Sequence, residues 1–180
     1  MRTKNLFLVL LPLMVMVVLF CGVSATEVIR FDFEGDNWKN VVLEPKEAQI
    51  TTIDGVPVCQ LGWKGSWGWV GVTFRNPVDI IDENMVMRIK WRIDCSDRNT
   101  MSDVILRVYY GRDLKEYSNV RIGNPGDYTF NEWQVSEVRL TDYERFPLWG
   151  KVYRVDLYER GSGNSTYTPS IASIEFMIKE

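Results

Sequence analysis

The chain has 180 residues, 46% of them hydrophobic, with 21 Lys and Arg against 24 Asp and Glu, no His, and a formal net charge of −3. This length fits one domain with a hydrophobic core, and the acidic balance argues against a nucleic-acid partner, which usually requires a basic surface. The absence of His excludes histidine acid–base catalysis, Ser-His-Asp and Cys-His nucleophiles, and His-ligated metals.

The N-terminus has the pattern of a secretory signal peptide. Arg2 and Lys4 precede an apolar run over 6–20, and Val23 to Ala25 supplies small residues where a signal peptidase cleaves. The pattern predicts cleavage after Ala25.

We therefore expect a signal peptide over 1–25 and a single mature domain over 26–180 that makes no membrane contact once the leader is removed. The mature domain would be secreted, periplasmic or held at the cell surface. Two alternatives remain, an uncleaved membrane anchor and a lipid-modified Cys21.

The mature chain shows strand periodicity throughout, because apolar and polar residues alternate and no stretch has a 3.6-residue apolar period. Asp54-Gly55 is a hairpin-turn signal between two such runs. The least periodic segments, 36–46, 124–130 and 141–149, are predicted to be loops. The runs with period two lie at 28–33, 48–53, 57–63, 67–74, 84–95, 104–110, 133–140, 151–158 and 170–178.

Regular strands with turns between them and no helical segment indicate an all-β fold. We predict an antiparallel β-sandwich, or jelly roll, of about nine or ten strands. In the longest run, 84–95, alternate apolar residues from Met85 to Cys95 would face the core.

After cleavage of the leader, only Cys59 and Cys95 remain. An even number of cysteines in an oxidising compartment permits a disulfide between them. The alternative is two buried thiols, since both lie in apolar strand-like contexts and free cysteine is often buried in cores. Two cysteines without His do not make a zinc site.

Three segments carry a family resemblance by their order and spacing. Residues 31–38 form an apolar-acidic strand, a Gly-containing turn and Trp38, residues 132–140 continue from Trp133 into spaced apolar positions, and 171–178 is an apolar closing strand. Together they resemble carbohydrate-binding modules with a galactose-binding-like jelly roll. The resemblance covers most of the mature chain and implies a domain that binds a glycan.

Such modules often hold a structural calcium between the first and last strands, and the resemblance would make Glu34 and Asp36 its acidic ligands. Calcium requires six to eight oxygen ligands. Where many relatives add an Asp from the last strand, this sequence offers Ser173 and Glu175. The alternative is that these turn carboxylates are simply solvated. No other cofactor is expected.

Aromatic rings that stack on sugar faces, beside planar polar groups, are what a glycan site requires. Trp63, Trp67 and Trp69 bracket a Gly-containing turn, and Trp67 and Trp69 would share one face of a strand. We take Trp67 and Trp69 as ligand-binding candidates. The alternative is that these rings pack in the core, where Trp is usually found.

The polar faces of three predicted strands give the remaining candidates. If these strands are neighbours, they would form a sheet face of charged residues mixed with Tyr, although an ordinary solvated face is the alternative. The ligand-binding candidates on these strands are Arg88, Arg107, Tyr109, Arg154 and Tyr158.

The sequence does not indicate an enzyme. Its carboxylates form no tight pair of the kind glycosidases use, and it has no phosphate-binding loop or nucleophile elbow. We therefore expect an exported, non-catalytic carbohydrate-binding module. The alternative is a cell-surface structural or adhesion module that binds protein through an edge strand or an apolar patch.

Overall fold

The computed structural model describes residues 28–61, 68–95, 103–143, 149–159 and 167–179. These residues form eleven strands and two short 3-10 helices, η1 (Asn37–Asn40) and η2 (Leu140–Asp142). Within them, no helix is long and apolar enough to cross a membrane. The strands are β1 (Ile29–Asp32), β2 (Val41–Glu44), β3 (Ala48–Ile53), β4 (Val56–Leu61), β5 (Trp69–Asp79), β6 (Met85–Cys95), β7 (Val104–Tyr109), β8 (Tyr117–Gly123), β9 (Gln134–Arg139), β10 (Lys151–Glu159) and β11 (Tyr167–Ile178).

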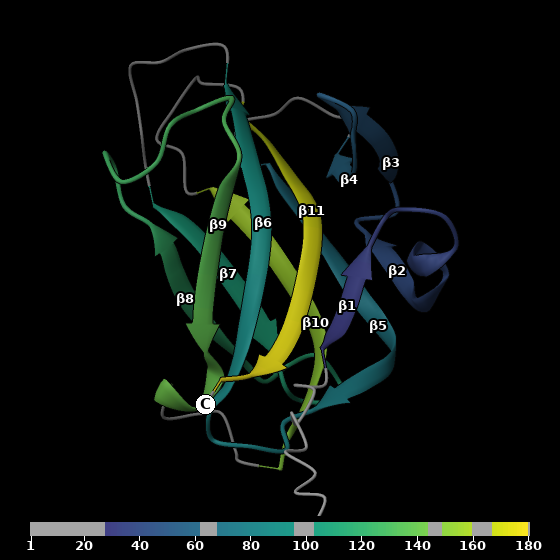
Figure 1. Ribbon diagram of the computed structural model, residues 1–180, viewed down its shortest axis with the longest axis vertical. Helices are drawn as coiled ribbons and strands as arrows, with labels where there is room; N and C mark the ends of the chain where they lie inside the picture. Colours follow the sequence, from purple (N-terminus) through teal and green to yellow (C-terminus); the bar gives the residue numbers. More distant parts are fainter. Residues whose placement is uncertain (1–27, 62–67, 96–102, 144–148, 160–166, 180) are drawn as a thin grey trace, which may run out of the picture.

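The strands form two antiparallel sheets that face each other as a β-sandwich (Figure 1). One sheet has six strands in the order β3-β4-β11-β6-β9, with β1 also paired to β11, and the other has the order β2-β5-β10-β7-β8. From β5 onward the chain repeatedly crosses between the sheets, so strands distant in sequence become neighbours. The predicted antiparallel sandwich of the jelly-roll type is confirmed.

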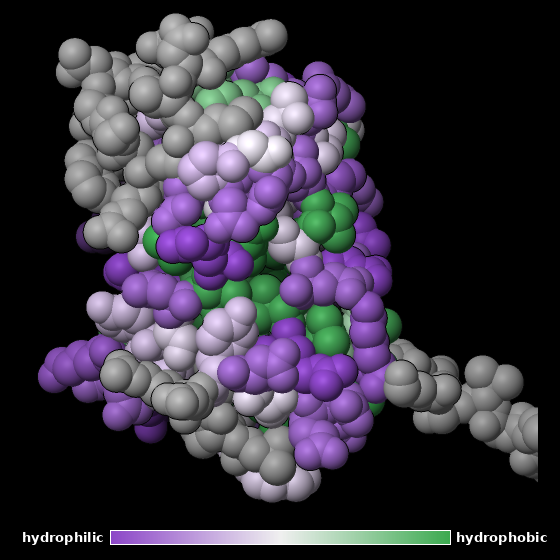
Figure 2. All heavy atoms as spheres, turned by 90° about the vertical axis from the view of Figure 1, so that its left-hand side faces the viewer, coloured by the Kyte–Doolittle hydropathy of each residue, from purple (hydrophilic) through white to green (hydrophobic). Residues whose placement is uncertain are grey.

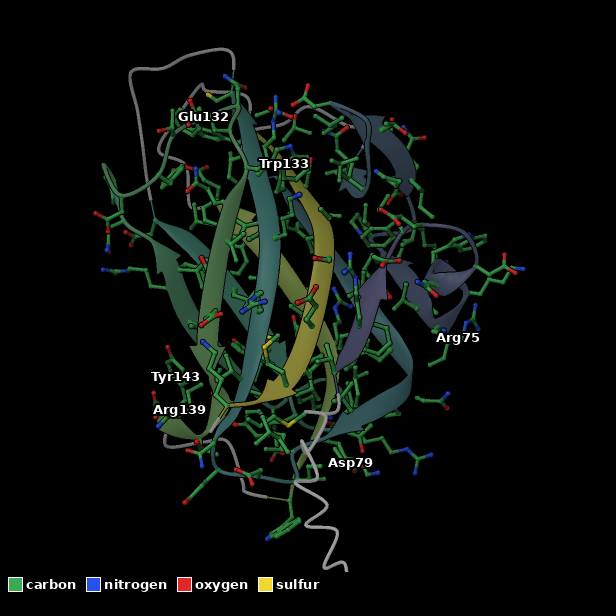
Figure 3. All side chains as sticks on the ribbon, viewed as in Figure 1. Arg75, Asp79, Glu132, Trp133, Arg139 and Tyr143 are labelled. Atoms are coloured by element: carbon green, nitrogen blue, oxygen red, sulfur yellow. The ribbon has the colours of Figure 1, made fainter. Side chains whose placement is uncertain are left out.

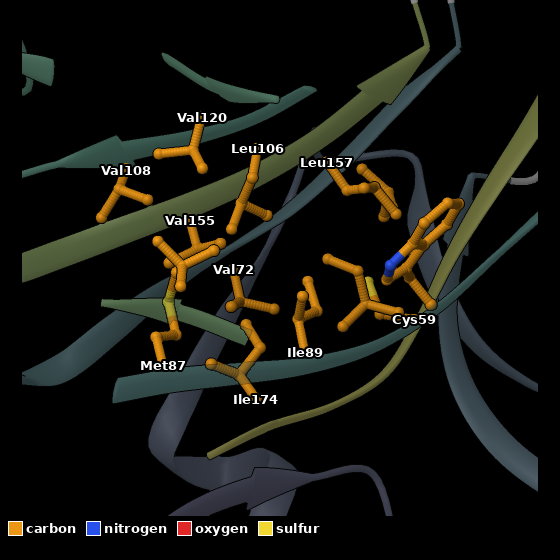
Figure 4. Close-up of a cluster of buried hydrophobic side chains, with 14 of the residues drawn as sticks. Cys59, Val72, Met87, Ile89, Leu106, Val108, Val120, Val155, Leu157 and Ile174 are labelled. Carbon is orange, nitrogen blue, oxygen red and sulfur yellow. The ribbon is translucent and has the colours of Figure 1, made fainter. Parts of the chain in front are cut away.

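The core lies between the sheets because alternate residues of each strand point inward. Met87 and Ile89 of β6 lie in the same buried cluster as Leu106 of β7 and Val155 of β10 (Figure 4). Seen from the edge that carries β8 and β9, apolar side chains appear between two polar outer surfaces (Figure 2). Trp91 is one of the largest buried side chains, only 1% exposed.

All nine predicted runs correspond to strands, but two strands were not predicted. β2 lies in 36–46, which was expected to be a loop, and that expectation was wrong for four residues. Four residues are too few to show a clear alternation of apolar and polar side chains. β8 turns only Ser118, Val120 and Gly123 fully inward, so its apolar content is too low to indicate a strand.

Register shifts occur in three strand pairs, and one of them, between β7 and β8, falls between Val104 and Ile105. The register of β10 against β5 shifts between Val152 and Arg154, and the register of β11 against β6 shifts between Ile171 and Ser173. In β10, Val152 and Val155 are both buried although they are three residues apart. The shift therefore sets which side chains of β10 leave the core.

Of the two alternatives for Cys59 and Cys95, a disulfide or two buried thiols, the structure contains two buried cysteines that are not bonded to each other. Cys59 lies opposite Ile171 and Cys95 opposite Tyr167, on the two sides of β11. Four residues along a strand, at about 3.3 Å each, and two strand spacings separate them. A disulfide requires Cα atoms within about 7 Å.

We expect Cys59 to be unreactive in the folded protein. Burial raises the pKa of its thiol to about 12, so at pH 8 only about one molecule in 10,000 carries the nucleophilic thiolate. Iodoacetamide labelling followed by peptide mass spectrometry should find Cys59 unmodified without denaturant and modified in guanidinium chloride. Rapid labelling of Cys59 under native conditions would contradict its burial.

Candidate ligand-binding site

A pocket of about 390 Å³ lies on the outer face of the five-stranded sheet. Its side chains come from the three central strands, β5, β10 and β7, which are adjacent in that order. The lining residues are Gly68, Trp69, Arg107, Tyr109, Arg154, Asp156, Tyr158 and Glu159.

Strand register places the outward-facing side chains next to each other. Arg154 lies opposite Tyr109, Asp156 lies opposite Arg107, and Tyr158 lies opposite Trp69. The residues between them on each strand, such as Val155 and Leu157, point into the core. The same alternation that builds the sandwich therefore gathers aromatic and charged side chains on its outside.

Asp156 is the buried centre of this site, with 4% of its surface exposed. Its carboxylate accepts hydrogen bonds from Arg154 Nε at 2.7 Å and from the Tyr109 hydroxyl at 3.0 Å. A Cβ at Gly71, opposite Asp156 on β5, would overlap the Asp156 carboxylate, so glycine is required there. Burial raises the pKa of Asp156, and the bonds from Arg154 and Tyr109 only partly offset this effect.

Arg154 links the carboxylates to the aromatic rings. Besides Asp156 it faces Glu44, with 3.8 Å between Nη1 and Oε1. Its guanidinium lies 5.0 Å from the centre of the Trp69 ring and 5.2 Å from that of Tyr109. The contact with Arg154 holds the Trp69 ring on the pocket side. Because Trp69 is only half-buried, part of the residue stays accessible to a ligand.

Arg107 is held by neutral groups. Its Nε donates to Asn119 Oδ1 at 3.0 Å, and its Nη2 donates to the Tyr158 hydroxyl at 3.0 Å. The guanidinium lies 4.4 Å from the centre of the Tyr117 ring and 5.0 Å from that of Tyr158. Asn119 and Tyr117 belong to β8, so this strand supports the pocket from the side.

The structure brings together most of the ligand-binding residues proposed from the sequence. Trp69, Arg107, Tyr109, Arg154 and Tyr158 all line the one pocket. Trp67 lies outside the described residues.

Arg88 is not part of this site. It lies on β6 in the opposite sheet, where it pairs with Glu137 at 2.7 Å and with Glu175 at 3.6 Å. The sequence analysis grouped Arg88 with the other candidates on the condition that their strands are neighbours, but alternation within a strand does not reveal which sheet the strand joins. Arg88 therefore belongs to an ion-paired surface.

The outer face of the six-stranded sheet has the character of an ordinary solvated face. Arg92 pairs with Asp54 and Asp94, at 2.5 and 2.6 Å. Lys90 and Arg92 lie over the ring of Trp133, near the start of β9 (Figure 3). Arg92 is therefore ion-paired on this face, whereas Lys90 contacts the Trp133 ring.

Sequence reasoning missed the part of the site that β8 contributes. Tyr117 and Asn119 alternate with the inward-facing Ser118 and Val120, so they share an outer face with Arg107. This alternation of polar and aromatic residues could have indicated them, had β8 been recognised as a strand. Gly68 and Glu159 carried no signal that pointed to the pocket.

Glu34 and Asp36, which the family resemblance implies as calcium ligands, lie on the surface after β1, and calcium binding there stays a prediction. Both are exposed, and Asp36 pairs with Lys39 at 2.8 Å. Across the described ranges, no group of three or more His, Cys, Asp or Glu side chains could hold a metal ion. The buried carboxylate beside them, Asp32, is bound by Arg30 and Asn37 instead.

No family model and no curated protein matches the chain. Solved structures do. A xylan-binding module, CBM15, shares 13% identity with a TM-score of 0.54, covering 86% of this chain and 98% of its own. A module specific for non-crystalline cellulose, CBM28, shares 10% identity with a TM-score of 0.52, covering 81% and 91%. A family 29 carbohydrate-binding module from Piromyces equi shares 8% identity with a TM-score of 0.51, covering 86% and 92%.

At such identities the likeness establishes a shared fold. The chain has the jelly-roll β-sandwich found in carbohydrate-binding modules.

Proposed function

We propose that this chain is an exported, non-catalytic carbohydrate-binding module that binds a polysaccharide segment in the pocket of the five-stranded sheet. The observation that carries the proposal is the grouping of Trp69, Tyr109 and Tyr158 with Arg107 and Arg154 in one pocket. Aromatic rings stack on the apolar faces of sugars, and fixed polar groups bind their hydroxyls.

The fold supports the same proposal by analogy. The neighbours include modules described as binding xylan and non-crystalline cellulose, although one fold can host different functions. The signal-peptide pattern over 1–25 adds that the domain would meet its ligand outside the cytoplasm.

The arrangement of the pocket carboxylates supports binding over hydrolysis. Glycosidases place two carboxyl groups across a cleft, one as an acid and one as a nucleophile or base. Asp156 is engaged by Arg154 and Tyr109, and Glu159 is fully buried three residues further along the same strand. We infer that neither carboxylate is placed to attack a sugar.

The test is a glycan screen of the mature domain, residues 26–180. Affinity electrophoresis with soluble xylan, glucuronoxylan, mannan, hydroxyethylcellulose and mixed-linkage glucan should show retardation by at least one polysaccharide, and calorimetry with its oligosaccharides should give a dissociation constant. Incubation with the bound glycan should release no reducing ends. Failure of every glycan to retard the protein would contradict the proposal and favour a protein-binding adhesion module.

A further inference from the structure

We infer that the pocket selects a sugar that carries a carboxylate, a uronic acid, and that Arg107 binds this carboxylate. The inference rests on the proposed function, because it names the class of glycan that the same pocket would take.

The two pocket arginines differ in their counter-ions. Arg154 already has two carboxylate neighbours, Asp156 at 2.7 Å and Glu44 at 3.8 Å. Among the residues that the structure describes, Arg107 has no carboxylate oxygen within 4.0 Å, although it lies opposite Asp156. The Asp156 carboxylate is occupied by Arg154 and Tyr109 instead.

Among the described residues Arg107 therefore makes no ion pair, although its charge acts on the Asp156 carboxylate, which Arg154 binds directly. Of the seven other arginines in the described strands, five form ion pairs with described carboxylates, and the two that do not, Arg75 and Arg139, are exposed and lie outside the pocket. The five that form ion pairs are Arg30, Arg88, Arg92, Arg121 and Arg154.

The neighbours of Arg107 fix the position of its guanidinium without neutralising it. Asn119 Oδ1 and the Tyr158 hydroxyl accept its hydrogen bonds, and the rings of Tyr117 and Tyr158 lie within 5.0 Å. A planar guanidinium held in this way is preorganised to bind a planar carboxylate through charge-assisted hydrogen bonds. Because aromatic rings line the same pocket, the carboxylate would be carried by a ring that can stack on them.

A neutral sugar satisfies this arrangement less well. Its hydroxyls can accept a hydrogen bond from Arg107, but they leave the partly enclosed guanidinium without a directly paired counter-ion. A uronic acid supplies that counter-ion together with an apolar ring face for Trp69 or Tyr158. Selectivity for acidic over neutral sugars follows from this difference.

The test compares one ligand in two chemical forms. Glucuronic-acid-substituted xylo-oligosaccharides are measured by calorimetry before and after reduction of their carboxyl groups to neutral alcohols. We expect reduction to weaken binding to the wild-type domain about tenfold or more, the size typical of one strong charge-assisted contact. The advantage of the acidic form should fall as salt is raised.

Variants test whether Arg107 causes the difference in affinity between the acidic and the reduced oligosaccharides. Arg107→Gln should bind the acidic and the reduced forms equally, and Arg107→Lys should keep only part of the difference, because an ammonium lacks the planar fork. Arg88→Gln, on the opposite sheet, is the matched control and should keep the full difference. Thermal melts check that each variant is folded, and the wild-type comparison stands even if Arg107→Gln does not fold.

The outcomes separate the two proposals. Equal wild-type binding of the acidic and reduced oligosaccharides overturns the uronic-acid inference and leaves carbohydrate binding intact. A selectivity that survives in Arg107→Gln overturns the role of Arg107. Equally tight, Arg107-dependent binding of dextran sulfate would mean that the site recognises charge and not a carboxylate, which also overturns the inference. Binding of no glycan removes the proposed function itself.

Discussion

Replacing Trp69 with Ala should weaken glycan binding about 30-fold or more while leaving the domain folded. Trp69 is half-buried on the outer face of β5, and its ring lies beside Arg154 and opposite Tyr158 in the pocket. Aromatic anchors at binding sites commonly contribute about 2 kcal/mol, which corresponds to this change in affinity. Calorimetry with the best glycan of the screen measures the loss.

The matched control is Trp149→Ala, since Trp149 is 72% exposed and does not line the pocket. This variant should bind like the wild type. If Trp69→Ala binds within about threefold of the wild type, the ring is not the anchor. If its melting temperature falls sharply instead, Trp69 is chiefly a packing residue.

Trp91→Ala should have the opposite profile, a loss of about 3–5 kcal/mol in the free energy of unfolding. Trp91 is 1% exposed, its indole nitrogen donates to the Ser136 hydroxyl at 3.0 Å, and its ring lies 5.6 Å from that of Tyr128. Truncation removes a large buried ring and leaves a cavity between the sheets. Guanidinium denaturation followed by circular dichroism measures the difference.

Trp91→Phe tests whether volume or the hydrogen bond dominates. It keeps an aromatic ring but removes the donor to Ser136, so we expect a smaller loss than for alanine. An unfolding free energy of Trp91→Ala within about 1 kcal/mol of the wild type would show that the neighbouring side chains fill the space, contrary to the tight packing of this core.

The fold class was predictable because each strand segment, taken alone, shows the alternation of apolar and polar residues. In β6, the apolar face from Met85 to Cys95 is buried as the sequence indicates, and β3 has the predicted bounds of Ala48–Ile53. What alternation cannot convey is the pairing of distant strands. Arg107 and Arg154 line the same pocket because β7 and β10 pair, whereas Arg88 lies in the other sheet although its strand shows the same alternation.

The candidate site was predictable to the extent that its residues lie on recognisable strands. Trp69, Tyr109 and Tyr158 follow the period of two, so their outward direction could be inferred. The supporting contacts of Asn119 and the close approach of Gly71 to Asp156 depend on the registers of neighbouring strands. Those registers are decided by packing across the whole sheet.

The register shift in β10 constrains how this site can change in evolution. Downstream of the shift, Arg154, Asp156 and Tyr158 face outward while Val155 and Leu157 face the core. Substitutions at the outward positions can alter specificity while the core residues stay the same. A one-residue insertion or deletion at the shift would exchange the two sets, exposing valine and leucine and burying the charges. Ligand preference can therefore drift through point substitutions, whereas the length of this strand segment is fixed by folding.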